Sequence, residues 1–495
     1  MKIENLVGIF DDNQYGGKDK VAAKKLINKT DLEIYDMIDD KNKDRKDLMR
    51  TLLIPLSSNC STTVSVGIFI KAGSRDETKL YGIAHFLEHM TFNGTKKRTY
   101  NNLMLEMDSI GCTYNAMTST EFTLYYISGN PQDIELIIDI IIDLYLNPLY
   151  PESDIAKEKK VVLDELNLNK DKTYRVLSEY INQHLYKDVD ESLARPIIGY
   201  KETINNITRN DILKFRDKNY NGSNCLLCIS GNFIKEDAIE LIEKIFNAKL
   251  KKFNIPDKYN HEYIKHDPII KDILLVKPEL KQHLNITKGV NQTIINIIFN
   301  AYDNFNYYND VNNILCDVLS NGFSSRLFKL LRTKMNVCYT NSSFVRNYRD
   351  NGQMYISVAV NHNVVYKTIE AILDEINNIR ENGITEEELN IAKKQNSTSL
   401  LFQFKEPFEY LMYYGLQLLN NQPLYSISDM LDNISNVTMN DINLVIKNVF
   451  NKNNIVVVTM GQYSEKNKCP TDSKCKINRE PNKRTVSKLI NNMYY

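Results

Sequence analysis

A five-residue stretch with two histidines and one glutamate constrains this chain more than any other feature. His85, Glu88 and His89 stand at positions i, i+3 and i+4, which share one face of a helix. A helix here would offer two imidazole nitrogens to a single metal ion, with a carboxylate beside them. The alternative is a buried histidine pair satisfied by hydrogen bonds, because such a string also arises by chance. A catalytic zinc ion needs a third protein ligand and an open position for water. A third ligand in another segment would therefore favour the metal site over the histidine pair.

A second predicted helix further along the chain carries two glutamates on one face. Residues 151–154 indicate a helix start with Ser153 as its cap, and the apolar spacing continues over residues 155–166. Glu158 and Glu165 are separated by about two helical turns. Either they only keep a surface helix soluble, or Glu165 completes a set of two histidines and one glutamate. In the second case Glu158 lies behind the ligands and orients a histidine or the bound water.

The residues around both segments resemble a known family, the inverzincin metallopeptidases, which include pitrilysin, insulin-degrading enzyme and the mitochondrial processing peptidase beta subunit. The similarity is ordered along the chain, which makes chance a poor explanation. It covers residues 72–77 (AGSRDE), 82–84 (GIA), 90–95 (MTFNGT), 115–119 (NAMTS), 195–199 (RPIIG) and 202–204 (ETI).

The resemblance implies a role for each residue of the two helices. His85, His89 and Glu165 would bind one Zn²⁺ per chain, and Glu158 would orient them from behind. Glu88 would take a proton from the zinc-activated water as it attacks a peptide carbonyl, and would return it to the leaving amine. The implied activity is that of a zinc metalloendopeptidase.

The resemblance also implies how substrate is held. In the family an extended peptide lies along an edge strand by strand addition, and residues 113–127 are the candidate edge, with Asn115 and Ala116 nearest the scissile bond. The family stabilises the developing negative charge with an arginine and a tyrosine. Arg332 and Tyr339 match that pair. The alternative for them is a surface arginine and a core tyrosine.

Length and composition exclude several classes of protein. A chain of 495 residues suits two to four domains. With 62 basic and 62 acidic residues, it offers no electrostatic case for nucleic acid. The most apolar stretch, residues 134–146, contains three acidic residues and predicts an amphipathic helix rather than a membrane span.

Location is predicted from the amino terminus and the cysteines. The first residues lack the apolar core of a secretory signal and the arginine-rich character of a mitochondrial presequence. The eight cysteines are scattered, as in a reducing compartment. We therefore expect a cytoplasmic protein, although the resemblance alone would also allow a mitochondrial one.

The predicted fold class is α+β, with two homologous α/β halves joined by a linker. Each half is expected to be a mostly antiparallel sheet packed with helices, because strand and helix patterns recur in the same order. Where the first half has its metal helix, the second has residues 319–323 (LSNGF), which include no histidine or glutamate. The expected ranges are 1–47 for an amino-terminal extension, 48–253 for the catalytic zinc-binding half, 254–290 for the linker, 291–462 for the half without metal and 463–495 for a tail.

The expected substrate is an extended peptide or an unfolded protein segment. The family's closed chamber needs four homologous units and this chain supplies two, so the resemblance implies a homodimer or a heterodimer with a non-catalytic homologue. Two alternatives stay open: a non-catalytic structural subunit of a homologous complex, and a metal-binding module without turnover. The intact set of His85, Glu88, His89 and Glu165 argues against the structural subunit, because a scaffold has no need of ligand spacing.

Overall fold

The chain forms two compact units, each with its own sheet, in a computed structural model that describes residues 32–58, 60–253, 283–287, 290–422, 424–461 and 490. The first unit takes its described residues from the chain up to Phe253 and from Leu401–Met430. The second unit takes them from residues 283–400 and from Leu431 onward.

The first unit is built on a seven-stranded sheet in the order β4-β5-β3-β6-β2-β1-β7. Neighbouring strands are antiparallel except β2 and β6, which are parallel. The central strands β3 and β6 are buried along their whole length, whereas the edge strand β4 is half exposed. The strands are β1 (Glu33–Ile38), β2 (Arg50–Pro55), β3 (Val64–Ile70), β4 (Thr113–Thr118), β5 (Thr123–Gly129), β6 (Cys225–Gly231) and β7 (Lys249–Phe253).

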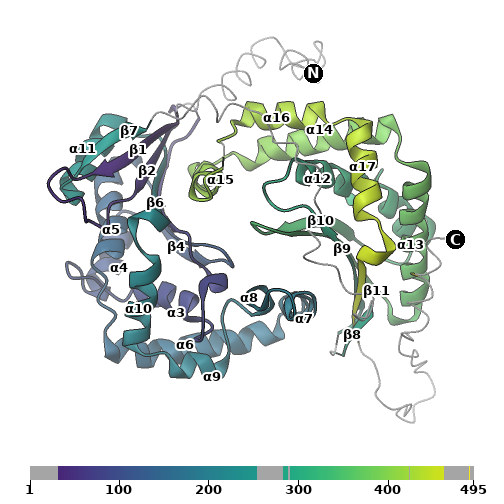
Figure 1. The fold of residues 1–495 in the computed structure, drawn as a ribbon, viewed down its shortest axis with the longest axis horizontal. Coiled ribbons are helices and arrows are strands. Elements are labelled where there is room, and N and C mark those ends of the chain that lie inside the picture. The colour runs from purple at the N-terminus through teal and green to yellow at the C-terminus, as the bar shows by residue number, and fades with distance from the viewer. Residues whose placement is uncertain are drawn as a thin grey trace. The chain divides into compact units, whose positions relative to one another are not determined.

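Helices cover both faces of this sheet. Alternate residues of a strand point to opposite faces. Ile68 of β3 belongs to the core that includes helix α5, whereas Phe69 lies against Gly415 of α15. Helix α15 therefore returns from late in the chain to cover the first sheet (Figure 1). The helices of this unit are α3 (Ile83–Thr91), α4 (Tyr100–Ser109), α5 (Ile134–Leu146), α6 (Glu152–Asp171), α7 (Thr173–Tyr186), α8 (Glu191–Ala194), α9 (Lys201–Asn206), α10 (Arg209–Asn219), α11 (Lys235–Phe246) and α15 (Pro407–Leu419).

The second unit repeats this topology with a five-stranded sheet in the order β10-β11-β9-β12-β8. Its order corresponds strand by strand to β4-β5-β3-β6-β2, and its final pair, β12 and β8, is parallel like β6 and β2. The predicted duplication is therefore confirmed, as is the α+β class. The strands are β8 (His283–Thr287), β9 (Thr293–Ala301), β10 (Asn341–Asn347), β11 (Gly352–Val360) and β12 (Ile455–Gly461).

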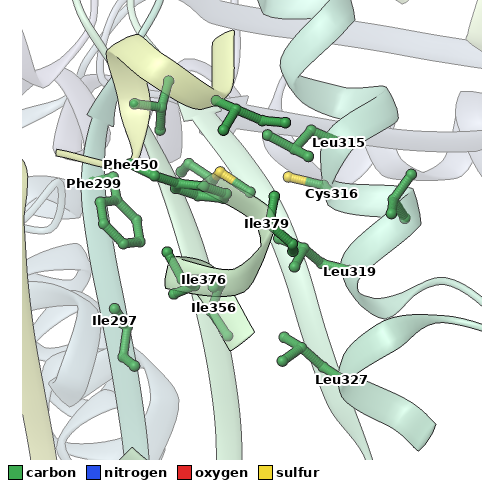
Figure 2. Packing of buried hydrophobic residues seen from close by; sticks show 14 of the residues in the cluster. Ile297, Phe299, Leu315, Cys316, Leu319, Leu327, Ile356, Ile376, Ile379 and Phe450 are labelled. Carbon is green, nitrogen blue, oxygen red and sulfur yellow. The ribbon is translucent and has the colours of Figure 1, made fainter. Parts of the chain in front are cut away.

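The core of the second unit packs between its sheet and its helices. Figure 2 shows Phe299 of β9 beside Phe450, whose ring centroids are 5.1 Å apart, with Leu319 and Ile379 nearby. The helices are α12 (Tyr307–Ser320), the π-helix η7 (Phe328–Lys334), α13 (Val365–Asn382) and α17 (Met439–Val449), while α14 (Glu386–Gln403) and α16 (Ile427–Asn436) each run across a division between the units. No helix in the described part of the chain is long and apolar enough to cross a membrane.

Some details differ from the sequence interpretation. Strand β1 lies within the expected extension 1–47 yet pairs with β2 and β7, so the sheet begins before residue 48. Helix α6 begins at Glu152 with Pro151 as its N-cap, and Ser153 does not cap it. The expected linker and tail lie outside the described residues except for positions 283–287, 290 and 490. The domain boundaries themselves stay a prediction.

Candidate metal centre

Helix α3 presents the two histidines because its start is fixed and its opposite face is apolar. The N-cap Gly82 has φ of 95°, and a Cβ there would come within 2.4 Å of Ile198 O, so only glycine fits. The Glu77 carboxylate accepts hydrogen bonds from Gly82 N at 3.0 Å and Ala84 N at 2.9 Å, which satisfies donors of the first turn. Residues Ile83, Ala84, Phe86, Leu87 and Met90 are buried, which leaves His85, Glu88 and His89 on the other face.

Helix α6 packs against α3 (Figure 1), and this contact brings Glu165 to both histidines. Glu165 Oε2 lies 3.6 Å from His85 Nε2 and 3.5 Å from His89 Nε2, and the three ligand atoms lie within 4.8 Å of one another. Tetrahedral zinc with bonds of about 2.0–2.1 Å holds its ligand atoms ~3.3 Å apart. The cluster therefore fits a zinc ion with little movement of its side chains.

Glu158 contacts the cluster through His89. Its Oε1 is 2.9 Å from His89 Nδ1, so a proton on Nδ1 leaves the Nε2 lone pair for a metal. Asn93 donates to Glu158 Oε2 at 3.4 Å, and Asn169 donates to Glu165 Oε1 at 3.3 Å. By contrast, the buried His85 Nδ1 has no hydrogen-bond partner within the described residues.

The electrostatics of the cluster favour a cation. Burial lowers the pKa of His85 to about 4, which keeps its imidazole neutral and able to bind a metal. Burial opposes a charge on His89, but hydrogen bonds to Glu158 and Glu165 outweigh it and raise its pKa to about 10. The hydrogen bond from His89 is the main cause that lowers the pKa of Glu165 to about 2. Without metal, His89 is therefore a protonated imidazolium that lies between the carboxylates of Glu158 and Glu165.

Glu88 connects this cluster to the edge strand. Its Oε2 accepts a hydrogen bond from Thr118 Oγ1 at 2.7 Å, and burial raises its pKa. Asn115 and Ala116 lie on the same strand, β4, which pairs on one side only within the described sheet. Sequence reasoning gave no role to Thr118 or Glu77, although both stand in segments that carry the family resemblance.

Arg332 and Tyr339 belong to the second unit and contact each other. Arg332 Nη1 donates to Tyr339 O at 3.0 Å, and the guanidinium lies 4.6 Å from the centre of the Tyr339 ring and 5.1 Å from that of Phe328. Tyr339 is 76% exposed, so the alternative of a core tyrosine is wrong. Substrate contact by this pair stays a prediction.

Two family models match the chain in sequence order. The model described as insulinase, peptidase family M16, matches residues 53–199, which hold α3 and α6. The model described as the peptidase M16 inactive domain matches residues 206–396.

Bacterial relatives carry the name "uncharacterized zinc protease". The relative from Rickettsia felis is 30% identical over 345 residues, which are 68% of this chain and 78% of the relative. The relative from Rickettsia bellii is 31% identical over 344 residues, with the same coverage of 68% and 78%. One from Bacillus subtilis is 27% identical over 386 residues, covering 77% of this chain and 88% of the relative.

Solved structures share the fold. A protease from Helicobacter pylori has a TM-score of 0.71 at 20% identity and covers 87% of this chain and 100% of its own. A structure described as a peptidase M16 inactive domain, from Pseudomonas fluorescens, has a TM-score of 0.71 at 17% identity, covering 84% and 96%. At these identities the likeness establishes the architecture alone.

Proposed function

This chain belongs to the insulinase family of peptidases, family M16, and from that premise we propose that it is a zinc-dependent endopeptidase. The family resemblance read from the sequence is thereby confirmed. The proposed reaction is hydrolysis of peptide bonds in extended peptides or unfolded protein segments. The observation that carries the proposal is the Glu88 carboxylate, which stands on the same helical face as two imidazoles that share one carboxylate oxygen of Glu165.

The chain's own groups divide the work of the reaction. His85 Nε2, His89 Nε2 and Glu165 Oε2 would hold the zinc ion, and Glu158 would keep His89 turned toward it. When bound, zinc lowers the pKa of a water molecule toward ~7 and polarises a peptide carbonyl. Glu88 would accept a proton from the attacking water at a carboxylate oxygen and return it to the leaving nitrogen.

The edge strand β4 is the proposed place for substrate. The edge of β4 that has no partner strand in the described sheet can pair with an extended peptide through main-chain hydrogen bonds, which bind many sequences. Asn115 and Ala116 would lie nearest the scissile bond, on the strand that also reaches Glu88 through Thr118. A homodimer, or a heterodimer with a non-catalytic homologue, stays a prediction, as does a cytoplasmic location.

A chelator and one substitution test the proposal on the purified full-length protein. A mixed peptide library is incubated with and without a zinc chelator, and products are followed by mass spectrometry. We expect cleavage that the chelator stops and added zinc restores. Glu88→Gln should bind zinc as the wild type does but lose activity by about 10²–10⁴-fold, the usual contribution of a positioned acid or base.

Glu240→Gln is the matched control, because Glu240 is an exposed residue of α11. It should cleave like the wild type. Cleavage by Glu88→Gln at the wild-type rate would refute the proposed role of Glu88. Zinc binding without any cleavage would instead favour the alternative of a metal-binding module without turnover.

A further inference from the structure

We propose that Thr118 is a positioning residue that fixes the Glu88 carboxylate and ties it to the strand on which substrate docks. This inference rests on the proposed function, and it adds a residue to which the sequence gave no role. Thr118 Oγ1 donates to Glu88 Oε2 at 2.7 Å, and Thr118 is the last residue of the edge strand β4. The base and the substrate strand therefore meet at one side chain.

The hydroxyl of Thr118 stands at a firmly held end of the strand. Thr118 pairs with Thr123 across the β4–β5 hairpin, and Thr123 Oγ1 donates to Ala72 O at 2.9 Å. Just beyond it, Ser119 O accepts a hydrogen bond from Ser74 N at 3.2 Å. The backbone around Thr118 is thus fixed on both strands of the hairpin.

A buried arginine holds the turn that follows β4. Arg75 Nη1 lies 2.6 Å from Glu121 Oε1, and Arg75 Nη2 lies 2.6 Å from Asp190 Oδ2 at the start of α8. Ion pairs that are largely shielded from water restrict motion more than exposed pairs do. Gly73 permits the close approach, because a Cβ there would stand 2.3 Å from Ser119 O. The turn cannot shift without breaking these contacts, so Thr118 offers Glu88 a rigid reference point.

Such a reference matters because a glutamate side chain rotates freely unless it is held. A base must keep its oxygen within hydrogen-bond reach of the proton that it takes, and small misplacements of reacting groups are costly. With Oε2 held by Thr118, the rotation of the carboxylate is set. A peptide added to β4 is aligned to the same strand, so β4 positions both the scissile bond and the carboxylate of Glu88.

The test compares three variants of the full-length protein. Thr118→Val keeps the β-branched shape and removes only the hydroxyl, whereas Thr118→Ser keeps the hydroxyl. Thr62→Val is the control, because Thr62 is an exposed threonine that lies outside β4 and outside the metal cluster. We expect Thr118→Val to lower kcat by about 10- to 100-fold, the loss that corresponds to removing one hydrogen bond to a charged group. KM and zinc content should stay at wild-type values, Thr118→Ser should restore most of kcat, and Thr62→Val should change nothing.

Three outcomes overturn the proposal. A rise in KM at constant kcat would place Thr118 in substrate binding only, and a loss of zinc would make its role structural. A failure of Thr118→Ser to restore kcat would show that the hydroxyl is not the active group.

Crystal structures of the wild type and Thr118→Val give a readout that needs no turnover. We expect Glu88 to point at Thr118 in the wild type and to change rotamer or occupy several in the variant. An unmoved Glu88 in Thr118→Val overturns the proposal even if cleavage is never observed. If Glu88 moves as expected but the wild type shows no chelator-sensitive cleavage, the proposed function fails while the positioning of Glu88 by Thr118 stands.

Discussion

The two units share one topology but hold different chemistry between equivalent helices. In the first, α3 follows β3 and packs with α6, and the metal cluster lies where they meet. In the second, α12 follows β9 and stands in the place of α3, while α14 stands in the place of α6. A cavity of about 230 Å³ is lined by residues of these two helices and the segments beside them: Asp317, Val318, Asn321, Ser324, Ser325, Lys329, Thr385, Glu387, Glu388, Ile391, Ala392 and Gln395.

Two carboxylates that line this cavity, Asp317 and Glu388, accept hydrogen bonds from neighbouring side chains. Asp317 accepts hydrogen bonds from Asn321 at 3.1 Å and from Asn396 at 3.2 Å. Glu388 accepts from Arg326 Nε at 2.7 Å. In the first unit, by contrast, both Nε2 atoms of the histidines converge on Glu165 Oε2. An equivalent position in the fold therefore does not by itself give a candidate metal cluster; the ligand atoms must also converge, as they do in the first unit.

Matched removal of a carboxylate in each unit tests this difference and has the largest expected effect. Glu165→Gln removes the anionic ligand. Its zinc affinity should fall by more than the ~10–100-fold that is lost when a residue hydrogen-bonded to a metal ligand is substituted. Peptide cleavage should fall to background. Asp317→Asn should keep zinc and activity. The measurement is zinc per chain after dialysis, together with peptide cleavage. A second zinc ion in the wild type that Asp317→Asn removes would contradict the comparison.

The second unit is expected to contribute through Arg332 and Tyr339 rather than through a metal. Tyr339→Phe keeps the ring on which the guanidinium lies and removes only the hydroxyl. If that hydroxyl donates to the developing negative charge, kcat should fall by about 10²–10³-fold with zinc content unchanged. Tyr174→Phe, at another exposed tyrosine, is the control. Equal kcat values in both variants would show that the Tyr339 hydroxyl has no catalytic role. The contribution of the second unit to catalysis would then be smaller than proposed.

The sequence predicted the elements whose pattern is local. The helical spacing of α3 and α6 and the repeated order of elements in the second unit both follow from periodicity. Strands β7 and β10 were not predicted, because their polar sequences, KLKKF and NSSFVRN, are held mainly by backbone pairing. The assignment of α15 to the first sheet was missed as well, since an apolar helix face does not indicate which sheet it covers.

The candidate site divides in the same way. The spacing of His85, Glu88 and His89 is a property of one helical turn, so it could be read directly. Glu165 needed the family resemblance to select it from other glutamates. Thr118 and Glu77 were missed because their contacts with α3 form only when the chain folds, although both stand in segments that carry the family resemblance.

The helices α3 and α12 also differ in what caps their first turns, and this predicts the smallest effect. Asn306 caps α12 with a neutral side chain that accepts from Tyr308 N at 2.9 Å, whereas α3 depends on the titratable Glu77. Burial raises the pKa of Glu77 from the usual 4.5 to about 8, although two backbone donors oppose it. The folded state then holds this proton more tightly than the unfolded chain does. The stability that this gives is complete below about pH 4.5 and is lost as the pH rises to about 8.

Glu77→Gln removes this titration and keeps a side-chain oxygen that can accept one of the two hydrogen bonds. We expect the Tm of the wild type, measured with chelator present, to fall relative to that of Glu77→Gln between pH 5 and pH 8 by at least about 2 °C. The metal ligands titrate in both proteins, so the difference between the two curves isolates Glu77, and Glu240→Gln serves as the control for a lost surface charge. A constant difference across this range would mean that Glu77 is ionised throughout. The two backbone amide donors would then lower the pKa of Glu77 by more than burial raises it. Helix α3 would begin with a permanently charged carboxylate at its positive end. The difference between α3 and the neutral cap of α12 would then be larger than proposed.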